Sequence, residues 1–299
     1  MRVCRLFAAG IFAASLAMPA HAQVRSNSSA LPDGIKGAFA RGDFATAAKL
    51  LKPLADQDDV EAQVALGALY QGVQGVPRNS AEAVRLLTSA SEKGDQDAEY
   101  LLGEMYRDGD GVKKSEPNAA RYFSAAAKQG MPEAEFEMGK LYDPGYFEGT
   151  PARITIETTG QQLNSQGATI SKDATESARW YALAAGHGIP EAQYNLGNFY
   201  EKGDGVPQNH AEAARLYRAA AEKGIAGAQT NLGASYLFGQ GVPRDLTKAY
   251  IWSSIAAASG ISQAKENLQV IRDKLSRPQI VRAETLATQC VRTQYKQCG

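Results

Sequence analysis

Small and apolar residues recur along this chain at helical spacing, in segments that glycine-rich turns separate. In residues 60–71, Ala62, Leu66, Leu69 and Tyr70 fall at the intervals that place side chains on one face of a helix. After each turn comes an alanine-rich segment that ends at a glycine. The pattern predicts pairs of antiparallel helices.

These helix pairs repeat with a fixed period. A glycine preceded by leucine or methionine marks the first helix of each pair, and the interval is 36 residues from Gly67 to Gly103, from Gly103 to Gly139 and from Gly197 to Gly233. The interval from Gly139 to Gly197 is 58 residues, which is one period and 22 extra residues. An alanine five residues before each mark is found at Ala62, Ala98, Ala134, Ala192 and Ala228. A tyrosine three residues after it is found at Tyr70, Tyr106, Tyr142, Tyr200 and Tyr236. Such self-similarity predicts a solenoid of stacked units.

Glycine recurs at three positions of the repeat, and its structural role differs from one position to the next. Inside a helix it costs about 1 kcal/mol relative to alanine, so its recurrence at one register predicts close approach by another helix. The Gly-x-Gly turns, such as residues 203–205, supply positive φ values that other residues adopt poorly. The closing glycine suits the end of the second helix.

The recurring pattern Ala-x-x-x-Leu-Gly-x-x-Tyr-x-x-Gly-x-Gly-Val-Pro, with an alanine-rich second helix and a closing glycine, resembles the Sel1-like repeat family. This family is a branch of the tetratricopeptide-like helical repeats. The resemblance covers five repeats in residues 59–260. It implies an all-α, right-handed α/α solenoid of about five 36-residue helix-turn-helix repeats, with a concave surface that holds partner proteins. We expect an N-terminal capping helix pair in residues 33–58 and capping helices in residues 261–299.

The third repeat departs from the pattern, with an insertion at about residues 143–172. Asp143-Pro144-Gly145 is expected to stop its first helix. Residues 153–158 alternate in the manner of a strand, and residues 168–171 could pair with them as a hairpin. Loops of this length are often functional or disordered, so a recognition hairpin and a mobile loop without a role both stay open.

The first 22 residues have the order of a secretory signal peptide. Arg2 and Arg5 precede an apolar stretch, and Ala20-His21-Ala22 offers small residues for cleavage before Gln23. We expect a flexible segment at residues 23–32, no stable membrane insertion after cleavage, and an exported protein. A periplasmic location fits the leader best, and secretion is the alternative.

Cys290 and Cys298 suggest a disulfide in an exported chain. On one continuous helix their Cα atoms would lie about 12 Å apart, beyond the roughly 7 Å that a bridge allows. A disulfide therefore requires a last helix, starting near Pro278, that ends before Cys298 and folds back. Two free thiols are the alternative.

Charge and motifs favour binding over chemistry. The chain has 32 basic and 32 acidic side chains, and such a balance gives no long-range field to attract nucleic acid. Beyond the leader the only histidines are His187 and His210, and no catalytic or phosphate-binding motif is present. We expect no enzymatic activity, no catalytic residue, no metal and no cofactor.

The variable positions of the first helices are the candidates for contact with a protein or peptide partner, because such helices usually line the inner surface of a solenoid. They are Tyr100, Glu104, Phe136, Glu137, Lys140, Tyr194, Asn195, Asn198 and Asn231. Aromatic rings provide contact area at low entropy cost, whereas packing between repeats is the alternative role of Tyr100, Phe136 and Tyr194. The favoured function is a periplasmic adaptor or regulator. The alternatives are a secreted, effector-like factor and an enzyme that acts on cell-wall material.

Overall fold

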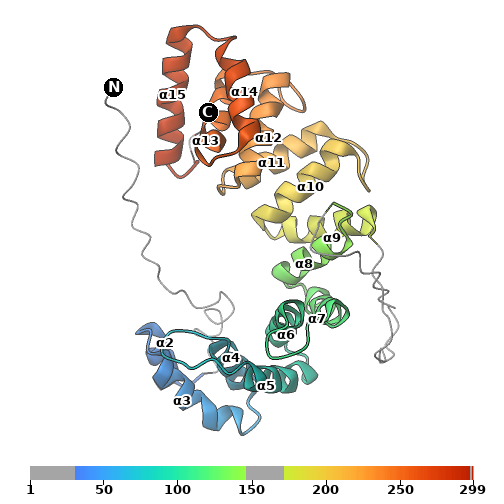
Figure 1. Cartoon of the computed structure of the whole chain (residues 1–299), viewed down its shortest axis with the longest axis vertical. Helices are drawn as coiled ribbons and strands as arrows, with labels where there is room; N and C mark the ends of the chain where they lie inside the picture. Colours follow the sequence, from blue (N-terminus) through green and yellow to red (C-terminus); the bar gives the residue numbers. More distant parts are fainter. Residues whose placement is uncertain (1–30, 146–171, 297, 299) are drawn as a thin grey trace. The chain divides into compact units, whose positions relative to one another are not determined.

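A computed structural model describes residues 31–145, 172–296 and 298 of the chain, and every element in these ranges is a helix (Figure 1). The signal peptide and the hairpin expected at residues 153–171 lie outside the described residues. The helices are α2 (Asp33–Ala40), α3 (Phe44–Ala55), α4 (Val60–Tyr70), α5 (Ser80–Glu92), α6 (Gln96–Asp108), α7 (Glu116–Lys128), α8 (Pro132–Tyr142), α9 (Ala174–Gly186), α10 (Pro190–Lys202), α11 (His210–Ala221), α12 (Ala226–Phe238), α13 (Leu246–Ala258), α14 (Ser262–Arg272) and α15 (Arg277–Arg292).

The predicted all-α repeat architecture is confirmed. Repeats one to five are the pairs α4 and α5, α6 and α7, α8 and α9, α10 and α11, and α12 and α13, and the two helices of each pair pack against each other. The chain divides into two compact units, of which unit one ends at Gln129 and unit two begins at Gly130.

Within each unit the helices pack in chain order. In unit one the helices α2 to α7 pack as successive neighbours, from α2 on α3 to α6 on α7, around a core that includes Leu51, Leu66 and Leu87. In unit two the helices α8 to α14 pack in the same way, from α8 on α9 to α13 on α14, and α15 packs on α13. The five alanines that precede the repeat glycines are fully buried, which explains why a small residue is needed at that register.

The repeat glycines lie where the second helix of the same repeat comes closest. A β-carbon on Gly103 would lie 2.6 Å from the Phe123 ring, and one on Gly197 would lie 2.6 Å from the Tyr217 ring. Leu87, Tyr181 and Ser253 occupy the equivalent places over Gly67, Gly139 and Gly233. A β-carbon is not tolerated at such distances from another side chain. Glycine therefore permits this close packing, although it makes the helix less stable than alanine would.

A backbone hydrogen bond closes the turn of every repeat. The N–H of Asn209, which caps α11, donates to the carbonyl oxygen of Tyr200 at 2.8 Å. The same bond joins Asn79 to Tyr70, Ser115 to Tyr106, Asp173 to Tyr142 and Asp245 to Tyr236. Because the third repeat keeps this bond at 2.9 Å, its extra residues leave the ends of α8 and α9 joined as in a repeat of ordinary length.

The second glycine of the Gly-x-Gly turn meets the preceding repeat. Gly205 has φ of 65° and Gly241 has φ of 72°. A β-carbon on Gly205 would overlap the backbone of Ala174 at the start of α9, and one on Gly241 would overlap the His210 carbonyl at the start of α11. These turns therefore set the approach of successive repeats within unit two, in addition to supplying positive φ.

The C-terminal end of unit two folds back on itself. Helix α15 ends at Arg292, and Gln294 and Tyr295 follow with φ of 52° and 64°. Cys290 and Cys298 form a disulfide with a Cα–Cα distance of 4.6 Å. Cys290 is fully buried in the core of unit two, so the bridge ties the last residues to that core.

Candidate functional site

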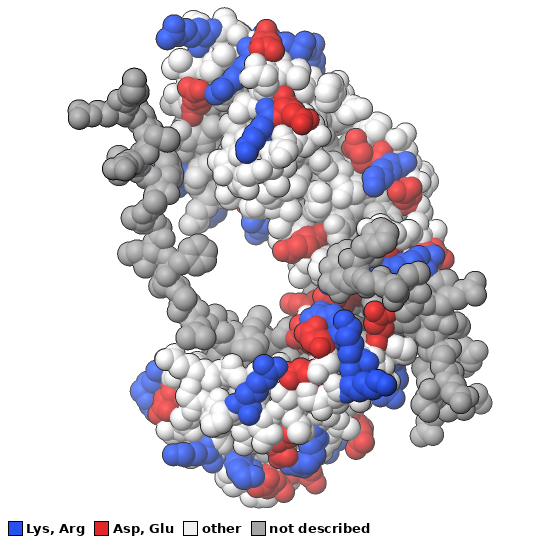
Figure 2. All heavy atoms as spheres, in the orientation of Figure 1, with Lys and Arg blue, Asp and Glu red and all other residues white. Residues whose placement is uncertain are grey.

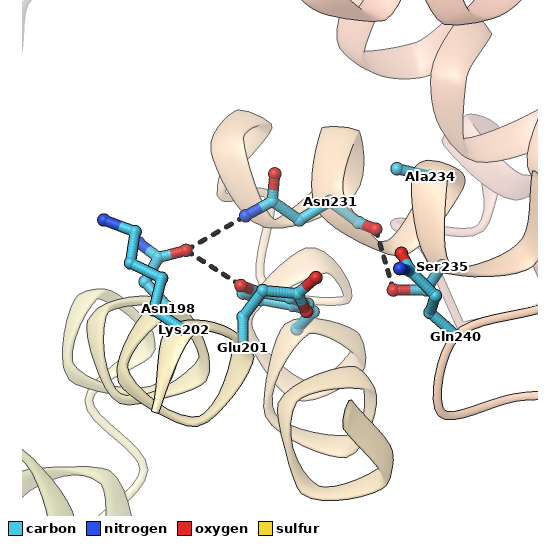
Figure 3. A pocket seen from close by; sticks show the side chains of 8 residues that line it. Asn198, Glu201, Lys202, Asn231, Ala234, Ser235 and Gln240 are labelled. Atoms are coloured by element: carbon cyan, nitrogen blue, oxygen red, sulfur yellow. Dashed lines mark hydrogen bonds between the residues drawn. The ribbon is translucent and has the colours of Figure 1, made fainter. Parts of the chain in front are cut away.

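A pocket of about 170 Å³ opens on the polar side of α10, α11 and α12 in unit two (Figure 3). It therefore spans the junction of repeats four and five. Its lining residues are Asn198, Glu201, Lys202, Tyr217, Asn231, Ala234, Ser235 and Gln240.

Two asparagines form the centre of this pocket. Asn231 Nδ2 on α12 donates to Asn198 Oδ1 on α10 at 3.0 Å, and Figure 3 shows the two side chains pointing toward each other. Asn198 directly follows the glycine of repeat four, whereas Asn231 lies two residues before the glycine of repeat five. The bond thus joins the first helices of two consecutive repeats.

Tyr217 orients this pair of amides. Its hydroxyl donates to the same Asn198 Oδ1 at 2.9 Å, while its ring lies over Gly197. Burial, with a smaller contribution from the negative charge of Glu201, raises the pKa of Tyr217, so the hydroxyl stays protonated as a donor. Because Asn198 Oδ1 accepts both bonds, the Asn198 Nδ2–H groups and the side-chain Oδ1 of Asn231 have no hydrogen-bond partner among the described residues and can meet a ligand.

The rim of the pocket carries balanced charge. It holds the carboxylate of Glu201 and the ammonium group of Lys202. Glu201 Oε2 lies 3.7 Å from His210 Nδ1, and Ser235 Oγ donates to the backbone carbonyl oxygen of Asn231 within α12 at 2.9 Å. The pocket therefore offers side-chain amide groups on a surface of nearly balanced charge.

The three aromatic candidates pack within their own units. Tyr100 is 7% exposed, and its ring centroid lies 5.5 Å from that of Phe123. At the same register, the ring of Phe136 lies 5.9 Å from Tyr181 and the ring of Tyr194 lies 6.2 Å from Tyr217. Each ring thus contacts the aromatic residue that covers the glycine of its repeat. This is the packing role considered for all three residues, and partner contact stays a prediction.

The charged candidates are held in ion pairs. Lys140 Nζ bonds both carboxylate oxygens of Glu137, at 2.9 and 3.0 Å, and also lies 5.6 Å from the centroid of the Phe136 ring. Glu104 Oε1 lies 3.6 Å from a guanidinium nitrogen of Arg107. These residues and the half-buried Asn195 lie outside the amide pocket. Asn198 and Asn231 are the predicted residues that the structure brings together there.

Several pocket residues were not predicted from the sequence: Glu201, Lys202, Tyr217, Ala234, Ser235 and Gln240. A usable signal existed for Tyr217. It lies 20 residues after Gly197, at the same interval that separates Phe123 from Gly103. In the four repeats of ordinary length, the residue 20 positions after the repeat glycine is therefore the one that covers it.

Two further properties concern the described residues alone. No helix among them combines the length and apolar content needed to cross a bilayer. Within residues 31–145, 172–296 and 298, no group of three or more histidine, cysteine, aspartate or glutamate side chains is arranged to hold a metal ion. Figure 2 shows acidic and basic side chains interspersed over the helices in view.

The chain belongs to the Sel1 repeat family. The family model matches residues 60–95, 96–131, 160–189, 190–225 and 226–261. The third match includes α9 but not α8, because the extra residues separate these two helices in the sequence. Proteins of this family are generally protein-interaction scaffolds, so the class that the fold defines is a binding protein built from repeats.

The solved structures that resemble the chain include two Sel1-repeat proteins. One is a protective antigen present in uropathogenic Escherichia coli strains and displaying an SLR fold, with 26% identity and a TM-score of 0.68, covering 85% of this chain and 50% of that one. The other is a Sel1 repeat protein from Oxalobacter formigenes, with 33% identity and a TM-score of 0.60, covering 76% of this chain and 60% of that one. The chain thus spans about half to three fifths of these relatives. No curated protein matches it.

Proposed function

We propose that this protein is a non-catalytic adaptor or regulator of the periplasm, and that it holds an extended segment of a partner protein at the junction of repeats four and five. The hydrogen-bonded set of Tyr217, Asn198 and Asn231 carries this proposal. It presents both donors and an acceptor from two consecutive repeats on one surface. A peptide backbone offers the complementary groups in each residue.

The local geometry supports a peptide over a small polar molecule. The pocket is open, and the two asparagines that line it come from different repeats. A segment that runs from α10 to α12 would first meet the side-chain N–H groups of Asn198 and then the side-chain oxygen of Asn231. Because Tyr217 fixes the orientation of Asn198, little side-chain entropy is lost when the segment binds.

The disulfide supports an exported location. Disulfides persist in oxidising compartments such as the periplasm and are rare in the cytosol. The Cys290–Cys298 bridge therefore fits the leader in residues 1–22. Fractionation of cells that express the native chain tests this location. The protein should be recovered in the periplasmic fraction, and its mass should be smaller by that of the leader.

A secreted factor that acts on another cell is the second candidate. The observation that favours it is the description of the Escherichia coli relative as a protective antigen. The two candidates share the binding surface and differ in location. Recovery of most of the protein from the culture medium would support secretion and overturn the periplasmic adaptor.

Affinity capture from envelope extracts tests the binding surface. The purified mature chain is compared with the double variant Asn198→Ala, Asn231→Ala. Loss of two hydrogen-bonding groups should weaken capture of the specific partner by roughly tenfold or more. The control is Asn118→Ala, which removes an amide from α7 in unit one and should leave capture unchanged. Equal capture by all three proteins contradicts the proposed site, provided that their circular dichroism spectra agree.

A further inference from the structure

A second pocket in unit two is basic and shares no residue with the amide pocket. It has a volume of about 220 Å³ and lies where α11, the end of α12, the following turn and the start of α13 meet. Its lining residues are Arg218, Tyr236, Val242, Pro243, Arg244, Asp245 and Lys248. Three of these side chains are cations and one is an anion.

The carboxylate in this pocket already has partners. Asp245 is the N-cap of α13, and its Oδ1 accepts hydrogen bonds from the backbone N–H groups of Thr247 at 2.9 Å and Lys248 at 3.0 Å. Among the described residues, no carboxylate forms an ion pair with Arg218, Arg244 or Lys248. By contrast, Arg215 on the same helix as Arg218 forms an ion pair with Glu212. The basic pocket therefore keeps an excess of positive charge.

The cations are held around one buried ring. A guanidinium nitrogen of Arg218 donates to the Tyr236 hydroxyl at 2.5 Å, and Lys248 Nζ lies 5.6 Å from the centroid of the Tyr236 ring. Arg244 Nε donates to the Leu237 carbonyl oxygen at 3.1 Å. Each of these contacts positions a cation and leaves N–H groups free of carboxylates, so the basic pocket is organised before a ligand arrives.

This arrangement is peculiar to the junction of repeats four and five. Lys248 occupies the register at which repeats one, three and four carry Glu82, Glu176 and Glu212, each in contact with an arginine three residues later. Arg218 occupies the register of Thr88, Ser124 and Ser254. Lys248 is therefore a base where these repeats carry an acid, and Arg218 has a guanidinium group where other repeats carry a hydroxyl. The repeat pattern does not require either change.

We propose that the basic pocket binds a carboxylate of the partner protein, supplied by a glutamate or aspartate side chain. This inference rests on the proposed scaffold function and names the chemistry of the partner. The guanidinium groups match the geometry of a carboxylate. Val242 and Pro243 line the same pocket and provide apolar contact for the stem of a glutamate. The partner segment is accordingly acidic.

A defined peptide tests this assignment by isothermal titration calorimetry. The probe is an acetylated and amidated tetraglutamate peptide, and tetraglutamine is the neutral reference. We expect tetraglutamate to bind the intact protein at low ionic strength, with affinity that falls as salt is added. Lys248→Glu, which restores the residue of other repeats, and Arg218→Ser should each weaken binding roughly tenfold.

The control for net charge is Lys265→Glu, because Lys265 is an exposed residue of α14 that does not line the basic pocket. It should bind tetraglutamate nearly as well as the unchanged protein. Equal weakening by Lys248→Glu and Lys265→Glu would show a non-specific field and overturn the inference. Absence of binding to the intact protein would also overturn it, as would binding of inorganic phosphate in place of tetraglutamate.

The outcome separates this inference from the scaffold proposal. If Lys248→Glu still captures the same envelope proteins at the same level and binds tetraglutamate unchanged, the carboxylate assignment fails and the scaffold stands. If tetraglutamate binds and depends on Lys248 while no envelope protein is captured, the basic pocket stands and the scaffold function fails.

Discussion

The hydroxyl of Tyr217 on α11 donates to Oδ1 of Asn198 on α10 at 2.9 Å. The residue that covers the glycine of repeat four therefore also sets the direction of an amide that faces repeat five. One side chain thus contributes both to core packing and to the pocket, because the ring of Tyr217 is buried over Gly197 while its hydroxyl reaches the pocket.

Replacing Tyr217 by Phe should lower the stability of the protein by about 1 kcal/mol near neutral pH, since one buried hydrogen bond is lost. The pKa of Tyr217 is raised in the folded protein, so its stabilising contribution is complete below about pH 10 and declines as the pH rises toward the folded value. Urea unfolding at pH 7 and pH 10.5 measures both effects. The unchanged protein should lose more stability over this interval than the variant, and equal losses would contradict the buried position of the hydroxyl. Tyr200→Phe on α10 serves as the control.

Replacing Gly197 by Ala should destabilise the protein by about 1–3 kcal/mol, although alanine is the better helix former. The new methyl group would lie 2.6 Å from the Tyr217 ring. Gly186→Ala in the last turn of α9 is the matched control, because no atom of the described residues lies within 4 Å of its β-carbon position. That variant should be unchanged or more stable by up to about 1 kcal/mol. Thermal unfolding of the two variants compares them directly. A shift of both melting temperatures in the same direction would contradict the close packing of Tyr217 on Gly197.

Replacing Glu135 by Gln should stabilise the protein at neutral pH by about 1 kcal/mol. Glu135 is 3% exposed, and its Oε2 has no hydrogen-bond partner among the described residues, with His187 Nε2 3.7 Å away. Burial raises the pKa of Glu135, with a smaller opposing effect of His187. Repeats one, four and five carry glutamine at this register, and each donates to a backbone carbonyl eight residues earlier.

The pH dependence of this variant has a definite sign. A raised pKa in the folded state means that the protonated form stabilises the fold, and that this contribution is lost as the pH rises through the folded value. The gain from Glu135→Gln should therefore shrink as the pH falls toward 4. Glu133→Gln removes the same charge from a half-buried position and should show less change. A gain that grows on acidification would contradict the interpretation.

Removing 22 residues from within residues 146–171 should leave the helical repeats folded, because this restores the ordinary interval between Tyr142 and Asp173. The backbone bond between these two residues closes the turn as in the other repeats. We expect a melting temperature within a few degrees of that of the full chain. Unchanged capture of the partner by the deletion variant would assign the insertion no part in recognition, whereas reduced capture with intact helices would support a recognition hairpin.

Helix pairs could be predicted from the sequence because their cause is local and periodic. The same structural requirement recurs at fixed positions in every repeat, as it does at Ala192, Gly197 and Tyr200 in repeat four. The pocket was harder to predict, because the meeting of Asn198 with Asn231 depends on how two helices of different repeats approach each other. The roles of Tyr100 and Phe136 were ambiguous for the same reason, since an aromatic residue on a first helix can face either a neighbouring helix or a ligand.

The tie between Cys290 and Cys298 has a consequence for the redox sensitivity of unit two. Here the bridge holds the fold-back that carries Tyr295, whose ring lies 3.4 Å from the β-carbon position of Gly224, the glycine that closes repeat four. Reduction would release this terminal segment and uncover apolar surface of unit two. The covalent tie thus links the last described residues to repeat four, so the order of this end of unit two should depend on the redox state of its surroundings.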